Sequence, residues 1–382
     1  MKKIIYISDG ISNKKYNAFS ISTHSFPKQQ MQRYNKTFLI GLSSVEGIKT
    51  EALSCIPFPA HRLIDSIKSE KESNCEYHYI PSSSNVLLRL LLNLFCAFFY
   101  VLTAPKGTQI IIDVLNISIN KGAIYASKIR KFRICGLVTD IPEYLNTSDK
   151  IKKHMNNNIC SCDSYILLSK KMSSAINPCN KPFLVIEGQI DDSNMQLISR
   201  SEKSTHKSCI YAGSLDKANG IDYLIEGFLR AHISDCTLEI YGAGNYSNII
   251  KEIASKHSNI IYGGQIKNEE LLPKLRKATL LINPRPTNQL FSMYSFPSKN
   301  MEYMASGTAL LTTHIPSMPD EYLPYIFVLK DETAEGLEKM LRYIFSKPGE
   351  ELYEMGKSAQ NFVFSNKTGK IQAKKIVDFL FP

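Results

Sequence analysis

The sequence predicts an α/β protein with two Rossmann-like domains, and three observations carry that prediction. The chain has 382 residues, which is more than one ordinary hydrophobic core accommodates. Short apolar runs alternate with segments long enough for crossover helices, as in doubly wound parallel sheets. A polar stretch then separates two such series. We expect a first domain at 1–190, a linker at 191–207, a second domain at 208–365, and a C-terminal helix at 366–382 that can pack back on the first domain.

The first series contains apolar runs typical of strands that are buried on both faces. They are Ile4–Ile7, Thr37–Ile40, Gln109–Val114, Ile134–Thr139 and Tyr165–Leu168. The segments between these runs are long enough for the helices that join parallel strands.

The second series begins after the polar stretch and repeats the same alternation. Its predicted strands are Ser208–Ala212, Thr237–Tyr241, Ile260–Tyr262, Leu280–Ile282, Ala309–Thr312 and Ile326–Leu329, and its predicted helices include Gly220–His232, Glu332–Phe345 and Lys370–Leu380. Ligands of such sheets bind at the carboxyl ends of the strands, so we expect a cleft where the two domains face each other.

The net charge limits the kinds of partner that fit this protein, and the cysteine pattern bears on its compartment and on metal binding. A net charge of +11 and a pI near 9.0 favour an anionic partner. Dense Lys/Arg runs with interleaved aromatic residues are missing from the sequence, so we expect no nucleic acid. The nine cysteines lack the spacing of a disulfide framework, which favours a reducing compartment. Cys160 and Cys162 with His154 lack a second ligand pair at zinc spacing, so we expect buried thiols, no metal and no cofactor.

One segment raises the question of a membrane. Asn85–Leu102 is apolar, but Arg89 and Asn93 interrupt it at a length that is borderline for a membrane span. A buried or interfacial helix is the favoured reading, and its apolar face could still contact a bilayer surface. The apolar run at the N-terminus is too short for a signal peptide. We therefore expect a cytoplasmic protein that can sit peripherally on the inner face of the cytoplasmic membrane.

The segment Phe296–Gly307 is the most informative for chemistry. Pro297 and Ser298 suit the start of a helix, and Gly307 suits its end. Lys299 near that helix N-terminus would complement a pyrophosphate, because the N-terminus itself attracts phosphate. Glu302 is the acid inside the helix and could accept hydrogen bonds from ribose hydroxyls. The alternative is a solvated lysine and a surface acid.

Two glycine-containing turns follow predicted strands of the second domain. The turn at Gly213, with Lys217 four residues later, precedes a helix and could hold a diphosphate. The turn at Gly242 and Gly244 would let a base or a sugar approach the backbone. Each signal is weak alone, since tight turns use glycine for purely structural reasons. The sequence matches neither the P-loop nor the complete dinucleotide fingerprint.

Two further residues stand at the ends of predicted strands. Arg285 follows Pro284, where it would face the cleft and could grip a phosphate with its planar fork of donors. Asp140 ends a strand of the first domain and could touch the acceptor or the transferred sugar. A capping role for Asp140 in the next segment is equally compatible with the sequence.

Five segments in order carry a resemblance to a known family. The segments are YAGSLDKANGIDYLIEGF, LEIYGAG, IIYGGQI, LLINPR and FPSKNMEYMASG. They resemble the donor half of glycosyltransferase family 4, which has the two-domain GT-B architecture, and they span about the whole second domain. The last two segments are similar to bacterial enzymes that build capsule, O-antigen or exopolysaccharide.

The resemblance implies roles for individual residues. Glu302 would bind the ribose. The diphosphate and the donor sugar would lie by Lys299, Pro297 and Ser298, and Gly213 would lie at the diphosphate turn. Gly242 and Gly244 would border the base. The segment Ser8-Asp9-Gly10 resembles the first loop of the acceptor domain, without its usual double glycine, so Gly10 would lie at the acceptor.

Three positions depart from the family pattern. Tyr294 stands eight positions before Glu302, where the family often has a second glutamate that touches the donor sugar. Ser214 and Asn219 replace two customary phosphate-binding cations, so Arg285, Lys299 and Lys217 are the available substitutes, with Arg285 and Lys299 favoured. These departures leave the identity of the sugar open.

The predicted function is a retaining, metal-independent transfer of a sugar from a nucleotide diphosphate sugar to a glycan or lipid-linked acceptor hydroxyl. Arg285, Lys299 and a helix N-terminus would stabilise the departing diphosphate, and Asp140 would act at the reacting centre. The alternatives are a nucleotide-sugar epimerase of similar fold and a non-catalytic nucleotide-binding protein. An epimerase would convert the donor without an acceptor.

Overall fold

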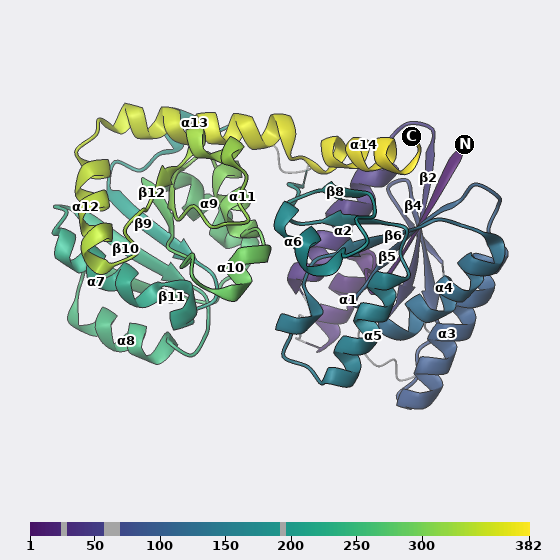
Figure 1. Cartoon of the computed structure of the whole chain (residues 1–382). Coiled ribbons are helices and arrows are strands. Elements are labelled where there is room, and N and C mark those ends of the chain that lie inside the picture. Colours follow the sequence, from purple (N-terminus) through teal and green to yellow (C-terminus); the bar gives the residue numbers. More distant parts are fainter. Residues whose placement is uncertain (24–28, 57–68, 192–195) are drawn as a thin grey trace. The chain divides into compact units, whose positions relative to one another are not determined.

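The computed structural model describes residues 1–23, 29–56, 69–191 and 196–382. The chain forms two compact units, one of Met1–Asp192 with Thr368–Pro382 and the other of Ser193–Lys367 (Figure 1). The C-terminal helix α14 (Gly369–Leu380) thus belongs to the first unit. An isolated parallel β-bridge between Ile190 and Thr368 joins the residue before α14 to the first unit.

The first unit is built on an eight-stranded sheet with the order β3-β4-β2-β1-β5-β6-β7-β8. All neighbouring strands are parallel except β3, which pairs antiparallel with β4. The strands are β1 (Lys2–Ser8), β2 (Ile48–Cys55), β3 (Glu70–Glu72), β4 (Cys75–Ile80), β5 (Gln109–Asp113), β6 (Ile134–Val138), β7 (Ser164–Leu167) and β8 (Phe183–Val185). Because the central strands run the same way, their carboxyl ends form one edge.

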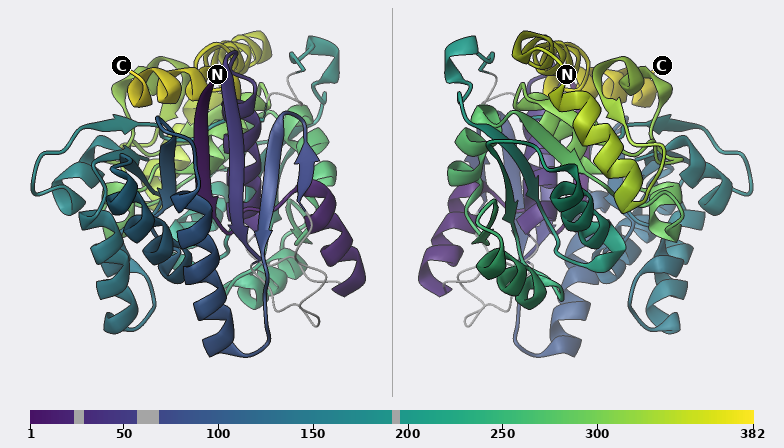
Figure 2. Two further views of the ribbon diagram at one scale, coloured as in Figure 1. Left: turned by 90° about the vertical axis from the view of Figure 1, so that its right-hand side faces the viewer. Right: turned by 90° about the vertical axis from the view of Figure 1, so that its left-hand side faces the viewer.

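Helices flank this sheet (Figure 2). They are α1 (Asn13–Thr23), α2 (Gln29–Ser43), α3 (Val86–Leu102), α4 (Ile117–Arg130), α5 (Asp149–Cys160), α6 (Lys170–Ile176) and α14, with a 3-10 turn η2 (Pro142–Tyr144). On one face, α2 and α14 pack together so closely that a Cβ on Gly41 would lie 2.5 Å from the carbonyl oxygen of Gly369. Phe38 and Ile376 from these helices are buried in the core of that face.

The predicted strand at Thr37–Ile40 is wrong, because these residues lie in α2. A short apolar run alone does not distinguish a strand from a buried helix turn. Phe38, Leu39 and Leu42 are all buried, at the spacing that puts them on one helix face. The strand that pairs with β1 is instead β2, which includes the polar residues of Lys49-Thr50-Glu51 and so lacks a continuous apolar run.

The second unit is built on a six-stranded parallel sheet with the order β11-β10-β9-β12-β13-β14. The strands are β9 (Lys207–Ala212), β10 (Cys236–Tyr241), β11 (Ile260–Gly264), β12 (Leu280–Asn283), β13 (Ala309–Thr312) and β14 (Phe327–Val328). The helices are α7 (Ile221–Ala231), α8 (Ser247–Lys256), α9 (Asn268–Lys277), α10 (Leu290–Tyr294), α11 (Ser298–Ala305), α12 (Ala334–Phe345) and α13 (Gly349–Asn366), with 3-10 turns η4 (Arg200–Glu202), η5 (Lys217–Asn219) and η6 (Asp320–Tyr325).

The chain segment that enters the second unit is held tightly from residue 196 onwards. Arg276 on α9 donates to the carbonyl oxygen of Gln196 at 2.8 Å and to Glu202 at 2.8 Å. Gln360 on α13 accepts from the amide of Ile198 at 2.8 Å. The part of the predicted linker that follows residue 195 is therefore bound to the second unit.

No helix within the described residues combines the length and the apolar character needed to cross a bilayer. The apolar segment singled out in the sequence forms α3, which packs against α4 in the first unit. Asn85 caps the start of α3 by accepting from the amide of Leu88 at 3.1 Å.

Candidate functional site

Two glycine loops meet backbone to backbone at the carboxyl ends of β9 and β10. The amide of Gly213 donates to the carbonyl oxygen of Tyr241 at 2.9 Å. A Cβ on Gly242 would overlap the carbonyl oxygen of Gly213, and one on Gly244 would lie 2.6 Å from the carbonyl of Leu215. Glycine is therefore required at these positions for close packing of the two loops.

The first of these loops leads through η5 into α7. Gly220 has φ +79 and serves as the N-cap of α7, and a Cβ there would overlap the carbonyl oxygen of Pro284. Lys217 is exposed on η5, and its ammonium lies 3.4 Å from Asp222 in the first turn of α7. The structure thus gives Lys217 a solvent-exposed ion pair, which contributes little to stability.

Helix α11 is fixed to the sheet by buried polar side chains. Pro297 is its N-cap residue and is buried, and the exposed Ser298 opens the helix. Asn300 accepts from Asn283 of β12 at 2.6 Å and donates to Thr312 of β13 at 3.2 Å. The hydroxyl of Tyr303 accepts from the backbone amide of Ala212, at the end of β9, at 2.7 Å. The N-terminus of α11 therefore has a defined position beside the Gly213 loop.

Lys299 extends from the first turn of α11 onto that loop. Its ammonium donates to the hydroxyl of Tyr211 at 3.3 Å and lies 4.8 Å from the centre of the Tyr211 ring. A Cβ on Gly213 would overlap this ammonium, so the glycine makes room for the cation. Burial and the nearby Arg285 lower the pKa of Lys299 to about 8, with Glu302 acting in the opposite direction.

Arg285 lies in the loop after β12, and α10 holds its guanidinium. It donates to Ser292 at 3.1 Å and to Ser295 at 2.9 Å, and it stacks 4.3 Å above the ring of Phe291. Burial lowers the pKa of Arg285 to about 10. The guanidinium is therefore charged at neutral pH and held in one orientation.

Glu302 is half-buried one turn after Lys299 on α11, and its charge is among the influences on the pKa of Lys299. Tyr294, which stands where the resembled family has a glutamate, is half-buried in α10. Two cations and a single carboxylate thus come together at the carboxyl edge of the sheet. Because both cations have lowered pKa values, an anionic group placed between them would relieve an unfavourable arrangement.

Three supporting residues were missed by the sequence analysis. Tyr211 receives Lys299 and donates to the carbonyl oxygen of Ser214 at 2.7 Å. Ser292 and Ser295 orient Arg285. Tyr211 directly precedes the Ala212-Gly213 turn and could have been found from that position, whereas nothing in the spacing identifies the two serines.

The candidate residues of the first unit have a different setting. Asp140 is exposed two residues after β6, and the N-cap of the following η2 turn is Ile141, so Asp140 does not occupy the capping position. Gly10 is buried after β1, where a Cβ would lie 2.8 Å from the Cβ of Asn35 on α2. Gly10 therefore permits helix packing, and Asp140 is the group that is open to a ligand.

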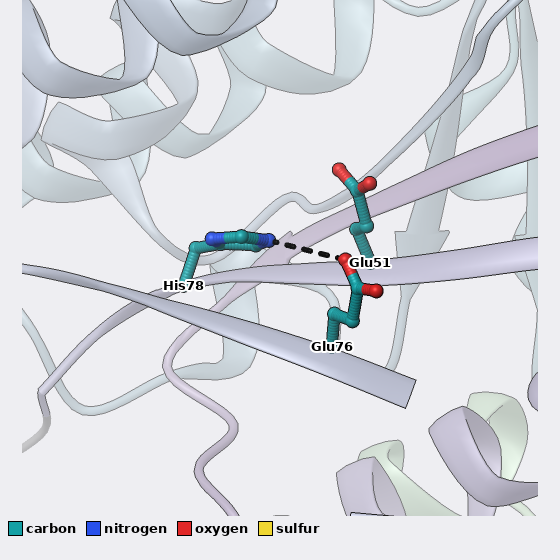
Figure 3. Close-up of side chains that lie close together, drawn as sticks. All are labelled: Glu51, Glu76 and His78. Carbon is teal, nitrogen blue, oxygen red and sulfur yellow. Dashed lines mark ion pairs between the residues drawn. The ribbon is translucent and has the colours of Figure 1, made fainter. Parts of the chain in front are cut away.

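A second polar cluster in the first unit joins Glu51 of β2 with Glu76 and His78 of β4 (Figure 3). Among the described residues it is the one group of three acidic, cysteine or histidine residues whose ligand atoms lie within 4.8 Å of one another. Lys3 and Lys49 already lie 2.8 and 2.9 Å from Glu51 and lower its pKa, together with Tyr100, to about 2. A metal ion would have to compete with both ammonium groups, so we assign the cluster a structural role.

Comparisons with known proteins agree with this geometry. Residues 206–344 match the family model described as glycosyl transferases group 1. No curated protein sequence matches the chain. Three solved structures share its fold over nearly their full lengths: sucrose-phosphate synthase from Thermosynechococcus elongatus (12% identity, TM-score 0.67, 100% of this chain and 99% of that one), a trehalose-6-phosphate protein from E. coli bound with UDP-2-fluoro glucose (10%, 0.69, 100% and 99%), and the lipopolysaccharide outer core galactosyltransferase WaaB (15%, 0.63, 99% and 99%).

At such identities the solved structures establish the fold, whereas the family model covers the unit that holds Gly213, Arg285, Lys299 and Glu302. The chain therefore has the GT-B fold, and residues 206–344 of its second unit are similar to the group 1 glycosyl transferases.

Proposed function

We propose that this enzyme transfers a sugar, with retention of configuration, from a nucleotide diphosphate sugar to an acceptor hydroxyl during synthesis of a bacterial surface polysaccharide. The observation that carries the donor half is the pair of Arg285 and Lys299, held next to the Gly213 loop by Tyr211, Ser292 and Ser295. A diphosphate would be bound between these cations. UDP-2-fluoro glucose on a protein of similar fold makes UDP-sugars the first donors to screen.

The proposed chemistry follows from charge. Breaking the bond between the sugar and the diphosphate leaves negative charge on the departing phosphate oxygen. Arg285 and Lys299 are positioned before the reaction, so little reorganisation is needed to stabilise that charge. Asp140 is the proposed contact with the acceptor or the transferred sugar. A glycan or lipid-linked acceptor, and a peripheral position on the inner face of the cytoplasmic membrane, complete the proposal.

Glu302 gives the sharpest test of the donor site. If it accepts hydrogen bonds from the ribose hydroxyls, the wild type binds UDP more tightly than 2′-deoxy-UDP, because one bond to a charged group is lost. In Glu302→Ala we expect at least about tenfold weaker UDP binding and no remaining preference between the two nucleotides. Calorimetric titration measures both, with the exposed Glu269 on α9 changed to alanine as a control.

Equal titrations of wild type and Glu302→Ala, with GDP as well as UDP, would contradict the assigned role of Glu302. Product analysis tests the reaction itself. The anomeric configuration of the product, read by NMR, must match that of the donor, and conversion of the donor without any acceptor would instead indicate an epimerase.

A further inference from the structure

The outward face of α3 is unusually apolar. Seven large apolar side chains along it are between 43% and 68% exposed: Val86, Leu87, Leu88, Leu90, Leu91, Phe95 and Phe99. Four of them, at 87, 91, 95 and 99, follow the four-residue spacing that forms one stripe of a helix. Isolated exposed leucines are ordinary, but a contiguous stripe of this kind marks an interaction surface.

The neighbouring helix extends this stripe. Gly122 of α4 packs directly on α3, because a Cβ there would overlap the carbonyl oxygen of Leu94. Tyr125 and Ile129 follow Gly122 on the same side of α4 and are 56% and 63% exposed. Helices α3 and α4 lie side by side on the outside of the first unit (Figures 1 and 2). We call the exposed apolar residues of both helices the α3–α4 surface.

Positive charge lies beside the α3–α4 surface. Residues 81–139 contain seven lysines and arginines and a single acid, Asp113, which is buried. The exposed basic residues include Lys128, Lys131 and Arg133 at the end of α4. Lys121 of α4 lies close to α5, where its charge is the first cause of a lowered pKa of His154, with Lys150 and Lys153 also contributing. Cations therefore lie beside the apolar stripe, chiefly at the end of α4.

We propose that the α3–α4 surface binds the surface of a bilayer that contains anionic phospholipid. An apolar stripe with lysines and arginines beside it matches both layers of such a membrane, since the apolar side chains enter the acyl boundary while the cations meet the phosphate groups. A second copy of this chain fits less well. A two-fold symmetric contact would bring the basic residues of both copies into one interface, where their charges repel.

The α3–α4 surface begins near the sheet edge of the first unit at which Asp140 lies. Helix α3 begins six residues after β4 ends, and Asp140 follows β6 by two residues. Because β4 and β6 run parallel in one sheet, both positions are at the same edge. Leu87 and Leu88, at the start of the α3–α4 surface, would thus bring the proposed acceptor edge to the membrane. This inference deepens the peripheral location proposed above and rests on it.

Vesicle flotation tests the proposal on the full chain. We expect the protein to float with vesicles of phosphatidylglycerol and phosphatidylcholine in equal parts, and about tenfold less with phosphatidylcholine alone. The double variant Leu91→Gln/Phe95→Gln should lose at least about tenfold in binding. The matched control, Ile249→Gln/Tyr343→Gln, changes two exposed apolar residues of the second unit and should bind like the wild type.

Charge is tested separately. Lys128→Glu/Lys131→Glu should weaken binding to the anionic vesicles about tenfold or more, whereas Lys374→Glu/Lys375→Glu, an equal charge change on exposed residues of α14, should have a much smaller effect. Raising the salt concentration should weaken the binding of the wild type.

Two results would overturn the proposal: no flotation with anionic vesicles, or flotation that the α3–α4 variants do not reduce. Sedimentation that shows a dimer lost in Leu91→Gln/Phe95→Gln would assign the surface to a second copy instead. Each variant is also titrated with UDP and GDP. Unchanged nucleotide affinity shows that the second unit is folded, so failure of membrane binding stays separate from failure of the proposed donor site.

Discussion

A glycine follows the first strand of each unit, but the two glycines make room for different neighbours. In the second unit, Gly213 makes room for the ammonium of Lys299. In the first unit, Gly10 makes room for Asn35 on a covering helix, and its carbonyl oxygen accepts from the hydroxyl of Ser54. The same backbone position therefore serves charge placement in one sheet and helix packing in the other.

This difference extends along both sheet edges. In the second unit, backbone contacts and buried asparagines fix the loops and α11, so a cation pair is in place before any ligand arrives. In the first unit, Asp140 follows β6 by two residues and is exposed. A preformed edge suits the nucleotide donor proposed for the second unit, and an exposed edge suits the larger acceptor proposed for the first.

The largest effect should come from Gly242→Ala, because the new methyl group would meet the rigid backbone of Gly213 rather than a side chain that can move. We expect nucleotide affinity to fall more than about 100-fold and stability to fall by about 1–3 kcal/mol. Calorimetry and thermal denaturation measure the two.

Gly264→Ala is the matched control for Gly242→Ala. It also places alanine at a positive φ, but no atom lies within 4 Å of the added Cβ. A loss of affinity in Gly264→Ala as large as in Gly242→Ala would show that backbone strain, and not contact between the two loops, is responsible.

Removal of the Lys299 charge ranks second. Lys299→Met keeps the length of the side chain but deletes a charge-assisted bond, so we expect about 10- to 100-fold weaker UDP binding. Lys217→Met should change affinity less than about threefold, because that ammonium is exposed and paired with Asp222. Equal losses in both variants would indicate a general effect of net charge.

The sequence offered both lysines as phosphate-binding cations, with Lys299 favoured, and the structure gives the two side chains different settings. Lys217 follows a glycine turn and Lys299 follows Pro297-Ser298 at the start of a helix, and these local patterns carry no information about burial. Lys299 is distinguished by Tyr211 and Gly213, which lie more than eighty residues earlier and meet it only through the order of strands β9 and β12. Short-range features such as the helix at Ser298–Ala305 and the β9 strand were predictable for the opposite reason, since their signals are local.

In the first unit, too, contacts between distant parts of the chain limit what the sequence can predict. Its β2 strand holds Glu51, which Lys3 and Lys49 pair from neighbouring positions of the sheet. A carboxylate within a strand reads as polar in the sequence, and only the pairing across strands makes it compatible with burial. The run Thr37–Ile40 in α2 reads as a strand because a short apolar run alone does not distinguish a strand from a buried helix turn.

The effect of pH should be smaller than that of Lys299→Met. With a pKa of about 8, lowered by burial and by Arg285, Lys299 is charged below that pH and neutral above it. Binding of a diphosphate requires the charged form, so the association constant for UDP should fall about tenfold between pH 7 and pH 9. Arg285, with a pKa of about 10, keeps most of its charge over that range.

Lys299→Met identifies the group behind this pH dependence. Its UDP affinity should be weak and nearly constant from pH 7 to pH 9, because the titrating ammonium has been removed. A slope that persists in Lys299→Met would assign the titration to another residue of the second unit.

The smallest effect on nucleotide affinity should come from Gly10→Ala, which returns to the contrast between the two glycines. The added methyl group would lie 2.8 Å from the Cβ of Asn35, so α2 must shift and we expect a loss of about 1–2 kcal/mol in stability. UDP affinity should stay within about twofold of the wild type. Gly213→Ala should weaken UDP binding strongly, since the end of the flexible Lys299 side chain must move and the cation leaves its place, and φ +156 at this position adds a cost in stability from backbone strain. If Gly10→Ala weakened UDP binding as much as Gly213→Ala, the first loop of the first unit would take part in donor binding, and the division of roles between the two sheet edges would be wrong.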